Sequence, residues 1–399
     1  MQKIMFYCQY LTGMGHLVRS TEIVRSLAKD FQVYFVNGGA KVEDFEIPSC
    51  VELISLPALW LEDGKFQIAN DSQSVEEIKQ TRKDRLLAAF DRVKPDCLIT
   101  EFFPFGRHKL FFELLPLLEH VQTTSPDTKI VCSIRDIIGR STIHEESDII
   151  VKLINQYFDL ILCHADPRFQ TFAANFSRIK ELNCDIEYTG FVAQSLPDTV
   201  TENDNFLANI NKDNPLIIVS VGGGRLGYEL LDSVIEASKI LENQISHQIQ
   251  IFTGPFMPEA QFLKLQQASS TRKNVNLRRY TNQLLNYIKK ADLSISLTGY
   301  NTTMNILRTN VRAIVVPIGH YDKDREQLLR TKKLEELKIV EVINPNNLEP
   351  AHLAEKIITS LKKETVRNSS DIFNLEGARN TAAFLKKYLE SSKHLALKS

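Results

Sequence analysis

The sequence predicts an α/β protein made of two doubly wound halves, each with a mostly parallel sheet between layers of helices. Short apolar runs alternate with longer segments of helical spacing, which is typical of such sheets. The alternation stops in a polar stretch at 195–214 and then starts again. A chain of 399 residues is also long for a single hydrophobic core. We therefore expect domains at 1–194 and 215–365, with a helical segment at 366–399 that packs back on the first domain.

The individual elements follow from the positions of these apolar runs. In the first half we expect helices at 17–29 and 73–93, and strands at 3–9, 31–37, 51–56, 96–100, 129–134 and 159–163. In the second half we expect strands at 216–221, 248–253, 293–296 and 313–317, and a final helix near 380–389.

Composition excludes several classes of protein. Basic and acidic residues nearly balance, 48 against 49, so the charge gives no reason to expect nucleic acid as a partner. The six cysteines show no CxxC spacing, and four lie in apolar runs, which favours buried thiols and a reducing compartment. The chain begins without a signal-peptide pattern and has no run of about 18 apolar residues, so we expect a cytoplasmic location.

A glycine-containing loop follows the first strand and is the first candidate site. Ligands of open parallel sheets bind beyond the carboxyl ends of the strands. Gly13, Met14 and Gly15 form this loop, and His16 then lies near the start of the next helix. A neutral imidazole there can take a proton from an acceptor hydroxyl, although a packing histidine fits the pattern equally well. We expect Arg19 to be a surface or phosphate-facing cation.

The same loop does not match a dinucleotide-binding fingerprint. The third glycine of GxGxxG would fall at Val18, and strand two ends at Asn37 without an acidic residue. NAD binding is therefore disfavoured.

A segment rich in phenylalanine follows the strand at 96–100. It opens with Glu101, which we interpret either as an acceptor ligand or as a partner of Arg107. An apolar, basic rim here could meet an amphiphilic acceptor or a membrane surface. The alternative, which we favour, is a helix with Phe111, Leu114 and Leu115 facing the core. The residues of that rim are Phe102, Phe103, Phe105, Arg107, His108 and Lys109.

Two further strand ends carry polar residues. Asp136, after Arg135, could orient a catalytic histidine or bind a sugar hydroxyl, or it could cap the next helix. His164 follows the strand at 159–163 and is a similar candidate on the acceptor side.

Two loops in the second half are suited to phosphate. Gly222, Gly223 and Gly224, followed by Arg225, lie between a strand and a helix, where backbone N–H groups bind anions. No GKS or GKT follows, so this is not a P-loop. The second loop also opens a helix, with capping by Asn301 or Thr302 as the simpler interpretation. Its residues are Thr298, Gly299, Tyr300, Asn301, Thr302 and Thr303.

A last polar loop precedes a helix start after the strand at 313–317. Glu326 or Gln327 could bind sugar or ribose hydroxyls. Asp322 and Asp324 superficially match a metal-binding DxD, but carboxylates that open a helix already complement its dipole. We therefore expect neither a metal nor a bound cofactor.

From residue 280 onward the chain resembles the donor half of MurG-like glycosyltransferases. The shared order of parts is Ala291-Asp292, the loop at 296–303, Val316-Pro317 and the Asp-Arg-Glu-Gln at 324–327. The two glycine loops extend the resemblance to both halves. The EFFPFGR stretch at 101–107 also resembles a group of bacterial predicted glycosyltransferases.

The resemblance implies a GT-B fold, in which two Rossmann-like domains face each other across a cleft, with a UDP-sugar donor and inversion at the anomeric carbon. It implies that 299–303 hold the diphosphate, that Glu326 and Gln327 contact the sugar or ribose, and that His16 faces the acceptor. Glu101 and Asp136 are the other catalytic candidates. The sequence departs from the family at Asn305, near where an acidic ribose ligand is expected, and at Arg330, in place of an asparagine.

Other activities of the same architecture remain open. The TGMGHLVRS loop at 12–20 also resembles the UDP-sugar hydrolase of pseudaminic acid biosynthesis, in which water replaces the acceptor. A UDP-sugar 2-epimerase and a non-catalytic nucleotide-sugar-binding protein are further alternatives. The expected partners are a nucleotide-sugar and a small-molecule or lipid acceptor, and peripheral contact with the inner face of a membrane is left open.

Overall fold

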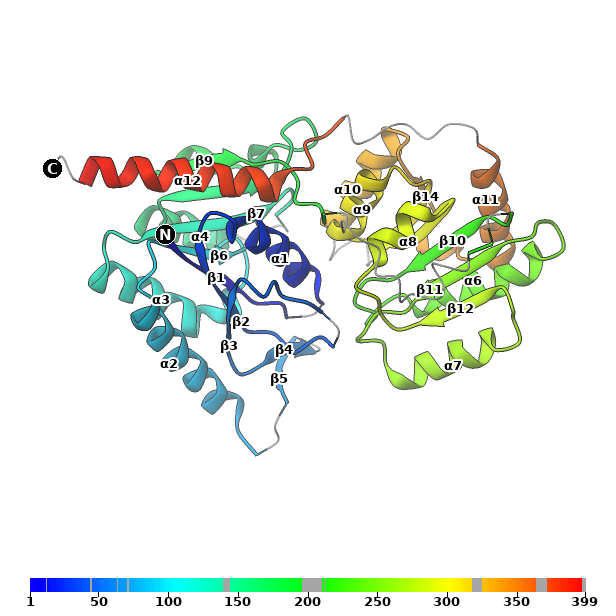
Figure 1. The fold of residues 1–399 in the computed structure, drawn as a ribbon, viewed down its shortest axis with the longest axis horizontal. Helices are drawn as coiled ribbons and strands as arrows, with labels where there is room; N and C mark the ends of the chain where they lie inside the picture. The colour runs from blue at the N-terminus through cyan, green and yellow to red at the C-terminus, as the bar shows by residue number, and fades with distance from the viewer. Residues whose placement is uncertain are drawn as a thin grey trace. The chain divides into compact units, whose positions relative to one another are not determined.

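The computed structural model describes residues 1–11, 13–43, 45–62, 64–69, 72–138, 144–195, 210–211, 213–317, 325–363 and 372–396 (Figure 1). The chain forms two compact units. The N-terminal unit consists of 1–41, 46–193 and 373–399, and the C-terminal unit consists of 42–45 and 194–372. Most of the polar stretch at 195–214 lies outside the described residues.

The N-terminal unit is built on a seven-stranded parallel sheet. Its order is β3 (Glu52–Ser55), β2 (Gln32–Asn37), β1 (Lys3–Cys8), β6 (Cys97–Glu101), β7 (Lys129–Arg135), β8 (Leu160–His164) and β9 (Asp185–Tyr188). A separate antiparallel hairpin consists of β4 (Leu59–Glu62) and β5 (Lys65–Ile68).

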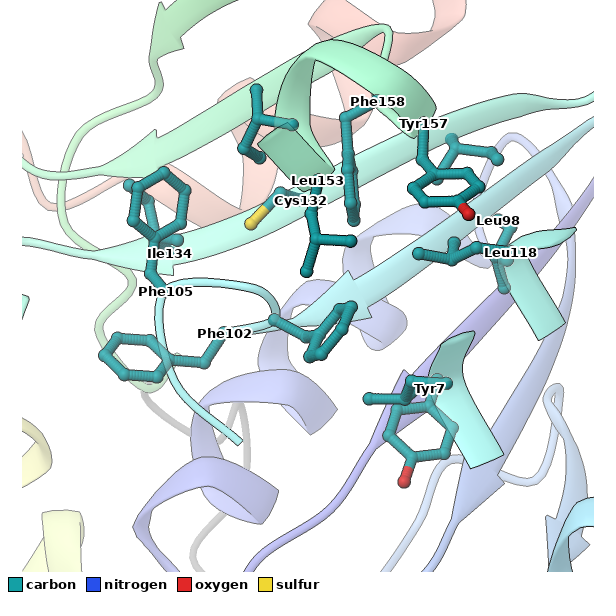
Figure 2. Packing of buried hydrophobic residues seen from close by; sticks show 14 of the residues in the cluster. Tyr7, Leu98, Phe102, Phe105, Leu118, Cys132, Ile134, Leu153, Tyr157 and Phe158 are labelled. Carbon is teal, nitrogen blue, oxygen red and sulfur yellow. The ribbon is translucent and has the colours of Figure 1, made fainter. Parts of the chain in front are cut away.

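Helices cover both faces of this sheet. On one face, α2 (Val75–Val93), α3 (Phe111–Thr124) and α4 (His144–Tyr157) share one hydrophobic cluster with the strands. Figure 2 shows part of that cluster, with Phe102 and Phe105 from the segment after β6. Away from this cluster, α1 (Gly15–Leu27) packs against α12 (Gly377–Ala396), so the end of the chain completes the N-terminal unit.

The C-terminal unit repeats the design with a six-stranded parallel sheet. Its order is β12 (Val275–Arg278), β11 (Gln248–Phe252), β10 (Leu216–Ser220), β13 (Leu293–Thr298), β14 (Ala313–Pro317) and β15 (Glu341–Val342). Its main hydrophobic cluster lies under α6 (Tyr228–Leu241), α7 (Glu259–Ser269) and α11 (Pro350–Lys362). The helices α8 (Leu284–Lys290), α9 (Tyr300–Thr309) and α10 (Arg325–Glu336) contribute nothing to that cluster. Short 3₁₀ turns occur at His108–Leu110, Phe172–Ala174, Ile179–Glu181 and Pro345–Asn347.

The predicted α/β fold is confirmed, and every predicted strand is present with ends within two residues of the prediction. The strands that sequence reasoning missed are the β4–β5 hairpin and three edge strands, β9, β12 and β15. Those edge strands are short and at best half-buried along most of their length, so they lack the apolar run that marks a central strand. All six cysteines are free, as predicted. Among the described residues, no helix combines the length and apolar character needed to cross a membrane.

Candidate functional site

A histidine–carboxylate pair lies at the carboxyl edge of the N-terminal sheet. Glu101 is the last residue of β6, and His16 is the second residue of α1. Nδ1 of His16 lies 2.6 Å from Oε1 of Glu101. An ionised carboxylate only accepts, so Nδ1–H is the donor and Nε2 keeps its lone pair. The His16 side chain is 17% exposed and that of Glu101 is fully buried.

Glu101 is also the partner of two arginines, the buried Arg19 and the partly exposed Arg107. Its Oε1 accepts a hydrogen bond from Nη2 of Arg19, and its Oε2 lies 4.0 Å from Nη2 of Arg107. Arg19 is only 2% exposed, so its prediction as a surface cation is wrong. The interpretation of Glu101 as a partner of Arg107 has structural support, although the closer contacts are to His16 and Arg19.

The charges in this cluster set the protonation of the pair. Burial, followed by the Arg107 cation, lowers the pKa of His16 to about 3, against an opposing effect of Glu101. Burial alone would raise the pKa of Glu101, but His16, Arg19 and Arg107 hold it well below its usual value. At neutral pH His16 is therefore neutral and Glu101 is ionised.

The segment from Phe102 to Arg107 is folded back over this pair. Phe102 and Arg107 have positive φ, 63° and 67°, which is uncommon for residues with side chains. A Cβ on Gly106 would lie 2.7 Å from the Phe102 ring, so only glycine fits there without movement. The Phe102 ring contacts His16 edge-on at 5.7 Å between centroids, and the Arg135 guanidinium lies over it at 5.2 Å.

The phenylalanines of this segment do not form an exposed rim. Phe102, Phe103 and Phe105 are at most 8% exposed and pack in the core cluster (Figure 2). The interpretation of these rings as an exposed apolar rim is therefore wrong, because they are buried in that cluster. Leu114 is buried as predicted, with Phe111 packed against the same cluster.

The remaining N-terminal candidates lie near the pair but do not join it. Asp136 is buried directly after β7, and Glu101, not Asp136, hydrogen-bonds His16. His164 is fully buried between the hydroxyls of Ser133 and Thr189, at 2.8 and 2.7 Å, an arrangement typical of a structural histidine. The described part of the glycine loop leaves open space around Gly13, while Met14 precedes α1 and Gly15 is its first residue.

In the C-terminal unit, β13 divides its side chains between two environments. Leu293, Ile295 and Leu297 belong to the main hydrophobic cluster. The alternating residues Ser294, Ser296 and Thr298 therefore face the opposite side of the sheet. Their hydroxyls are buried and have no hydrogen-bond partner among the described residues. Sequence reasoning did not identify this polar row, although the alternation of serine and apolar residues could have revealed it.

Helix α9 continues the polar row beyond the strand. Its N-cap is Gly299, which has no side chain to satisfy the first turn, so capping by Asn301 or Thr302 is wrong. The Thr303 hydroxyl is buried on the next turn, without a partner among the described residues, whereas Thr302 is half-buried. Tyr300 is buried, and the Arg330 guanidinium lies over its ring, 5.5 Å from the ring centre.

The triglycine loop is compact at one end and open at the other. A Cβ at Gly224 would lie 2.3 Å from the backbone oxygen of Thr253, whereas nothing lies within 4 Å of one at Gly222. Gly223 accepts a hydrogen bond from the Phe256 amide at 2.8 Å. Arg225 is exposed and lies 5.4 Å from the Phe256 ring centre.

Helix α10 places one donor-site candidate in an ion pair. Glu326 accepts from Nη2 of Arg330 at 2.8 Å, so this carboxylate already has a cation. Oε1 of Gln327 is buried and has no partner among the described residues. Asp322 and Asp324 lie outside the described residues. Within the described ranges, no group of three or more histidine, cysteine or acidic side chains could hold a metal.

Comparisons with known proteins agree with this architecture. Residues 218–383 match the glycosyltransferase family 28 C-terminal domain. The calicheamicin glycosyltransferase CalG4 is similar with 14% identity, coverage of 98% of each chain and a TM-score of 0.61. MurG of Acinetobacter baumannii matches with 14% identity, over 97% of this chain and 100% of that one, with a TM-score of 0.58.

A protein from Listeria monocytogenes, proposed to be a UDP-N-acetylglucosamine 2-epimerase, has the same fold. Its identity is 13%, its TM-score is 0.63, and the match covers 98% of this chain and 97% of that one. No curated protein sequence matches the chain. At these identities the structural matches show the fold, which is GT-B, and the family 28 domain match lies mostly within the C-terminal unit.

Proposed function

We propose that this protein is an inverting, metal-independent glycosyltransferase that moves a hexosyl group from a nucleotide-sugar, with UDP as the expected nucleotide, to an acceptor hydroxyl. The observation that carries the proposal is the His16–Glu101 pair, in which a buried carboxylate holds Nδ1 at 2.6 Å and leaves Nε2 able to take a proton. The family 28 domain match at 218–383 supports a nucleotide-sugar donor in the C-terminal unit.

The donor would be held without a metal by neutral groups at the carboxyl edge of the C-terminal sheet. The N-terminus of α9 and the backbone of Gly222 would meet the diphosphate, because helix N-termini and glycine amides stabilise negative charge. The buried hydroxyls of Thr298 and Thr303 supply further donors. Gln327 would contact the sugar or ribose.

In the transfer step the acceptor oxygen attacks the anomeric carbon as the bond to the nucleoside diphosphate breaks. Nε2 of His16 takes the acceptor proton, and Glu101 stabilises the imidazolium that forms. The diphosphate leaves with the bonding electron pair, stabilised by α9 and the glycine loop. One displacement of this kind inverts the anomeric configuration.

A nucleotide-sugar hydrolase is the main alternative, because water could occupy the position of the acceptor hydroxyl with the same base. The fold match to the proposed 2-epimerase keeps that chemistry as a second alternative. The three activities form different products: a transferase forms a glycoside, a hydrolase releases a free sugar, and an epimerase forms an epimerised sugar.

The test is a thermal-shift screen of UDP, GDP, ADP, dTDP and their sugars, with and without EDTA, followed by product analysis with the nucleotide-sugar that binds. Ligands that bind the folded state raise Tm by mass action. We expect one nucleotide to raise Tm equally with EDTA present. The absence of any shift would contradict the donor site, and a shift lost in EDTA would contradict metal independence.

A further inference from the structure

The carboxyl edge of the N-terminal sheet brings three arginines, one buried and two half-buried, close to the hydrogen-bonded carboxylate of Glu101. Glu101 binds Arg19 directly and lies 4.0 Å from Arg107. Arg135 lies over the ring of Phe102, the residue that follows Glu101. These cations come from three different elements: α1, the segment after β6, and the end of β7.

Among the described residues, Arg19 and Arg107 bring two positive charges to the one negative charge of Glu101, while His16 is neutral at pH 7. Asp136 is also buried, directly after Arg135. A buried charged group is costly unless it is paired, so the position of Arg107 favours an additional anion.

Arg107 presents the group that could bind this anion. Its side chain is 14% exposed, and Nε and Nη2 are buried without a hydrogen-bond partner among the described residues. Oε2 of Glu101 is 4.0 Å from Nη2, which is beyond hydrogen-bond distance. Nε and Nη2 form one edge of the guanidinium, and that edge matches the two oxygens of a carboxylate or phosphate.

The backbone reaches this arrangement at a cost. Phe102 and Arg107 both adopt left-handed backbone conformations, which are unfavourable for residues with side chains. Gly106 between them leaves room for the Phe102 ring. Strain of this kind is typical of ligand-binding segments, and here its result is that Arg107 returns to the His16–Glu101 pair.

We infer that the acceptor carries a carboxylate or phosphate group, which Arg107 binds with support from Arg135, and that this contact presents the acceptor hydroxyl to His16. The inference rests on the proposed function, because the acceptor is the molecule that His16 deprotonates.

The arrangement also couples acceptor binding to the strength of the base. The Arg107 cation lowers the pKa of His16, and an anion bound to Arg107 offsets that effect. His16 is then more basic when the acceptor is present than in the free protein. A neutral acceptor would lack this effect.

The first experiment uses inorganic phosphate as the probe in thermal-shift titrations without nucleotide. Phosphate should stabilise the wild type, and Arg107→Gln should abolish the shift in Tm. Arg107→Lys keeps the positive charge but loses the paired N–H donors of the guanidinium, so it should retain part of the shift. Lys109→Gln is the matched control, since it removes a positive charge from an exposed side chain two residues away. An equal shift in all four proteins would overturn the inference.

The second experiment compares acceptors that differ only in charge, such as glucose 6-phosphate and glucuronate against glucose. Arg107→Gln should raise the acceptor KM about 10- to 100-fold and leave the nucleotide-sugar KM unchanged. A raised nucleotide-sugar KM alone would assign Arg107 to the donor diphosphate and overturn the inference. A wild-type protein that uses glucose as well as the two anionic acceptors would overturn it too.

These results separate the two proposals. An Arg107-dependent phosphate shift without any nucleotide shift would leave the anion site standing and contradict the donor site. A nucleotide shift with a phosphate response independent of Arg107 would contradict the anionic acceptor alone. The melting temperature of each variant without ligand shows whether it is folded.

Discussion

The carboxyl edges of the two sheets have the same position in the same kind of fold, yet they are built from different chemistry. The N-terminal edge consists of a neutral histidine, His16, with the Glu101 carboxylate and the arginines around it. The C-terminal edge presents neutral groups, the hydroxyls of β13 and α9 and the backbone of the triglycine loop, beside the Glu326–Arg330 ion pair. The N-terminal edge can take up a proton at His16, whereas the C-terminal edge is suited to binding a ligand that is already negatively charged, such as a diphosphate.

Substitutions at the two edges should also have different effects on the free energy of unfolding. Breaking a buried ion pair by removing one partner costs roughly 3–5 kcal/mol, because it leaves an uncompensated charge. A buried hydroxyl without a partner already costs roughly 1–3 kcal/mol, so its removal can stabilise the fold. Substitutions at the N-terminal edge should therefore disturb chemistry and folding together, and those at the C-terminal edge should separate binding from stability.

The largest effect is expected for His16→Ala. Loss of a general base lowers kcat about 10²- to 10⁴-fold, because no side chain is then positioned to remove the proton from the substrate hydroxyl. Nucleotide affinity, measured by titration calorimetry, should stay unchanged because the donor groups belong to the C-terminal unit. His120→Ala, at a surface pair with Asp91, is the control. Turnover retained by His16→Ala would remove this residue from the base role.

The next effect concerns Glu101→Gln, which removes the charge that orients His16. We expect kcat to fall about 10- to 10³-fold, with a pH profile that changes because the carboxylate raises the pKa of His16. Stability should fall as well, since Arg19 loses its partner.

Glu113→Gln distinguishes positioning from folding. Glu113 is equally buried and accepts from Nε and Nη2 of Arg82 at 2.9 and 2.7 Å, but it makes no contact with His16. This variant should lose stability and keep the wild-type pH profile of kcat. Identical profiles for Glu101→Gln and Glu113→Gln would show that Glu101 has only a structural role.

A smaller effect is expected at the C-terminal edge for Thr298→Val. The variant loses a buried hydroxyl without a partner among the described residues, so its free energy of unfolding should stay equal or rise. Its nucleotide affinity should fall about 3- to 10-fold, through one lost hydrogen bond to the ligand. Ser294→Ala removes a similar hydroxyl from the opposite end of β13 and should not affect affinity. Equal affinity losses would place the nucleotide elsewhere.

The same contrast explains what the sequence could predict. The strands, the triglycine loop and the loop at 298–303 are local patterns, and the structure has them where the sequence places them. The His16–Glu101 contact joins residues 85 positions apart, and the contact between Arg19 and Glu101 spans 82. The ends of β1 and β6 meet because the strands pair, and that pairing cannot be read from either segment alone.

Burial was the second limit. The segment at 102–107 looks like an exposed aromatic and basic rim in the sequence, because nothing local shows that φ is positive at Phe102 and Arg107. The fold turns the rings into the core and returns Arg107 to Glu101. His164 shows the same limit, since a polar residue at a strand end proved to be fully buried.

The last prediction concerns the pH dependence of stability, and it separates the two histidines of the N-terminal unit. Burial lowers the pKa of both His16 and His164 to about 3, from an ordinary value of 6.5. Between pH 6.5 and 3 the unfolded chain therefore binds more protons than the folded chain, so stability is lost as pH falls through this window. Each imidazole contributes about 1.4 kcal/mol per pH unit there.

His164→Gln should reduce the slope of the free energy of unfolding against pH by the contribution of one imidazole, while the contribution of His16 remains. The measurement is the free energy of unfolding in urea at several values between pH 5 and 6.5, a range above the usual titration of carboxylates. Burial between Ser133 and Thr189, followed by the charge of Arg19, lowers the pKa of His164 as far as that of His16, although the hydrogen-bond partners of His164 are neutral hydroxyls. An unchanged slope would mean that the native state accommodates a charged His164, and would leave His16 as the pH-sensitive group.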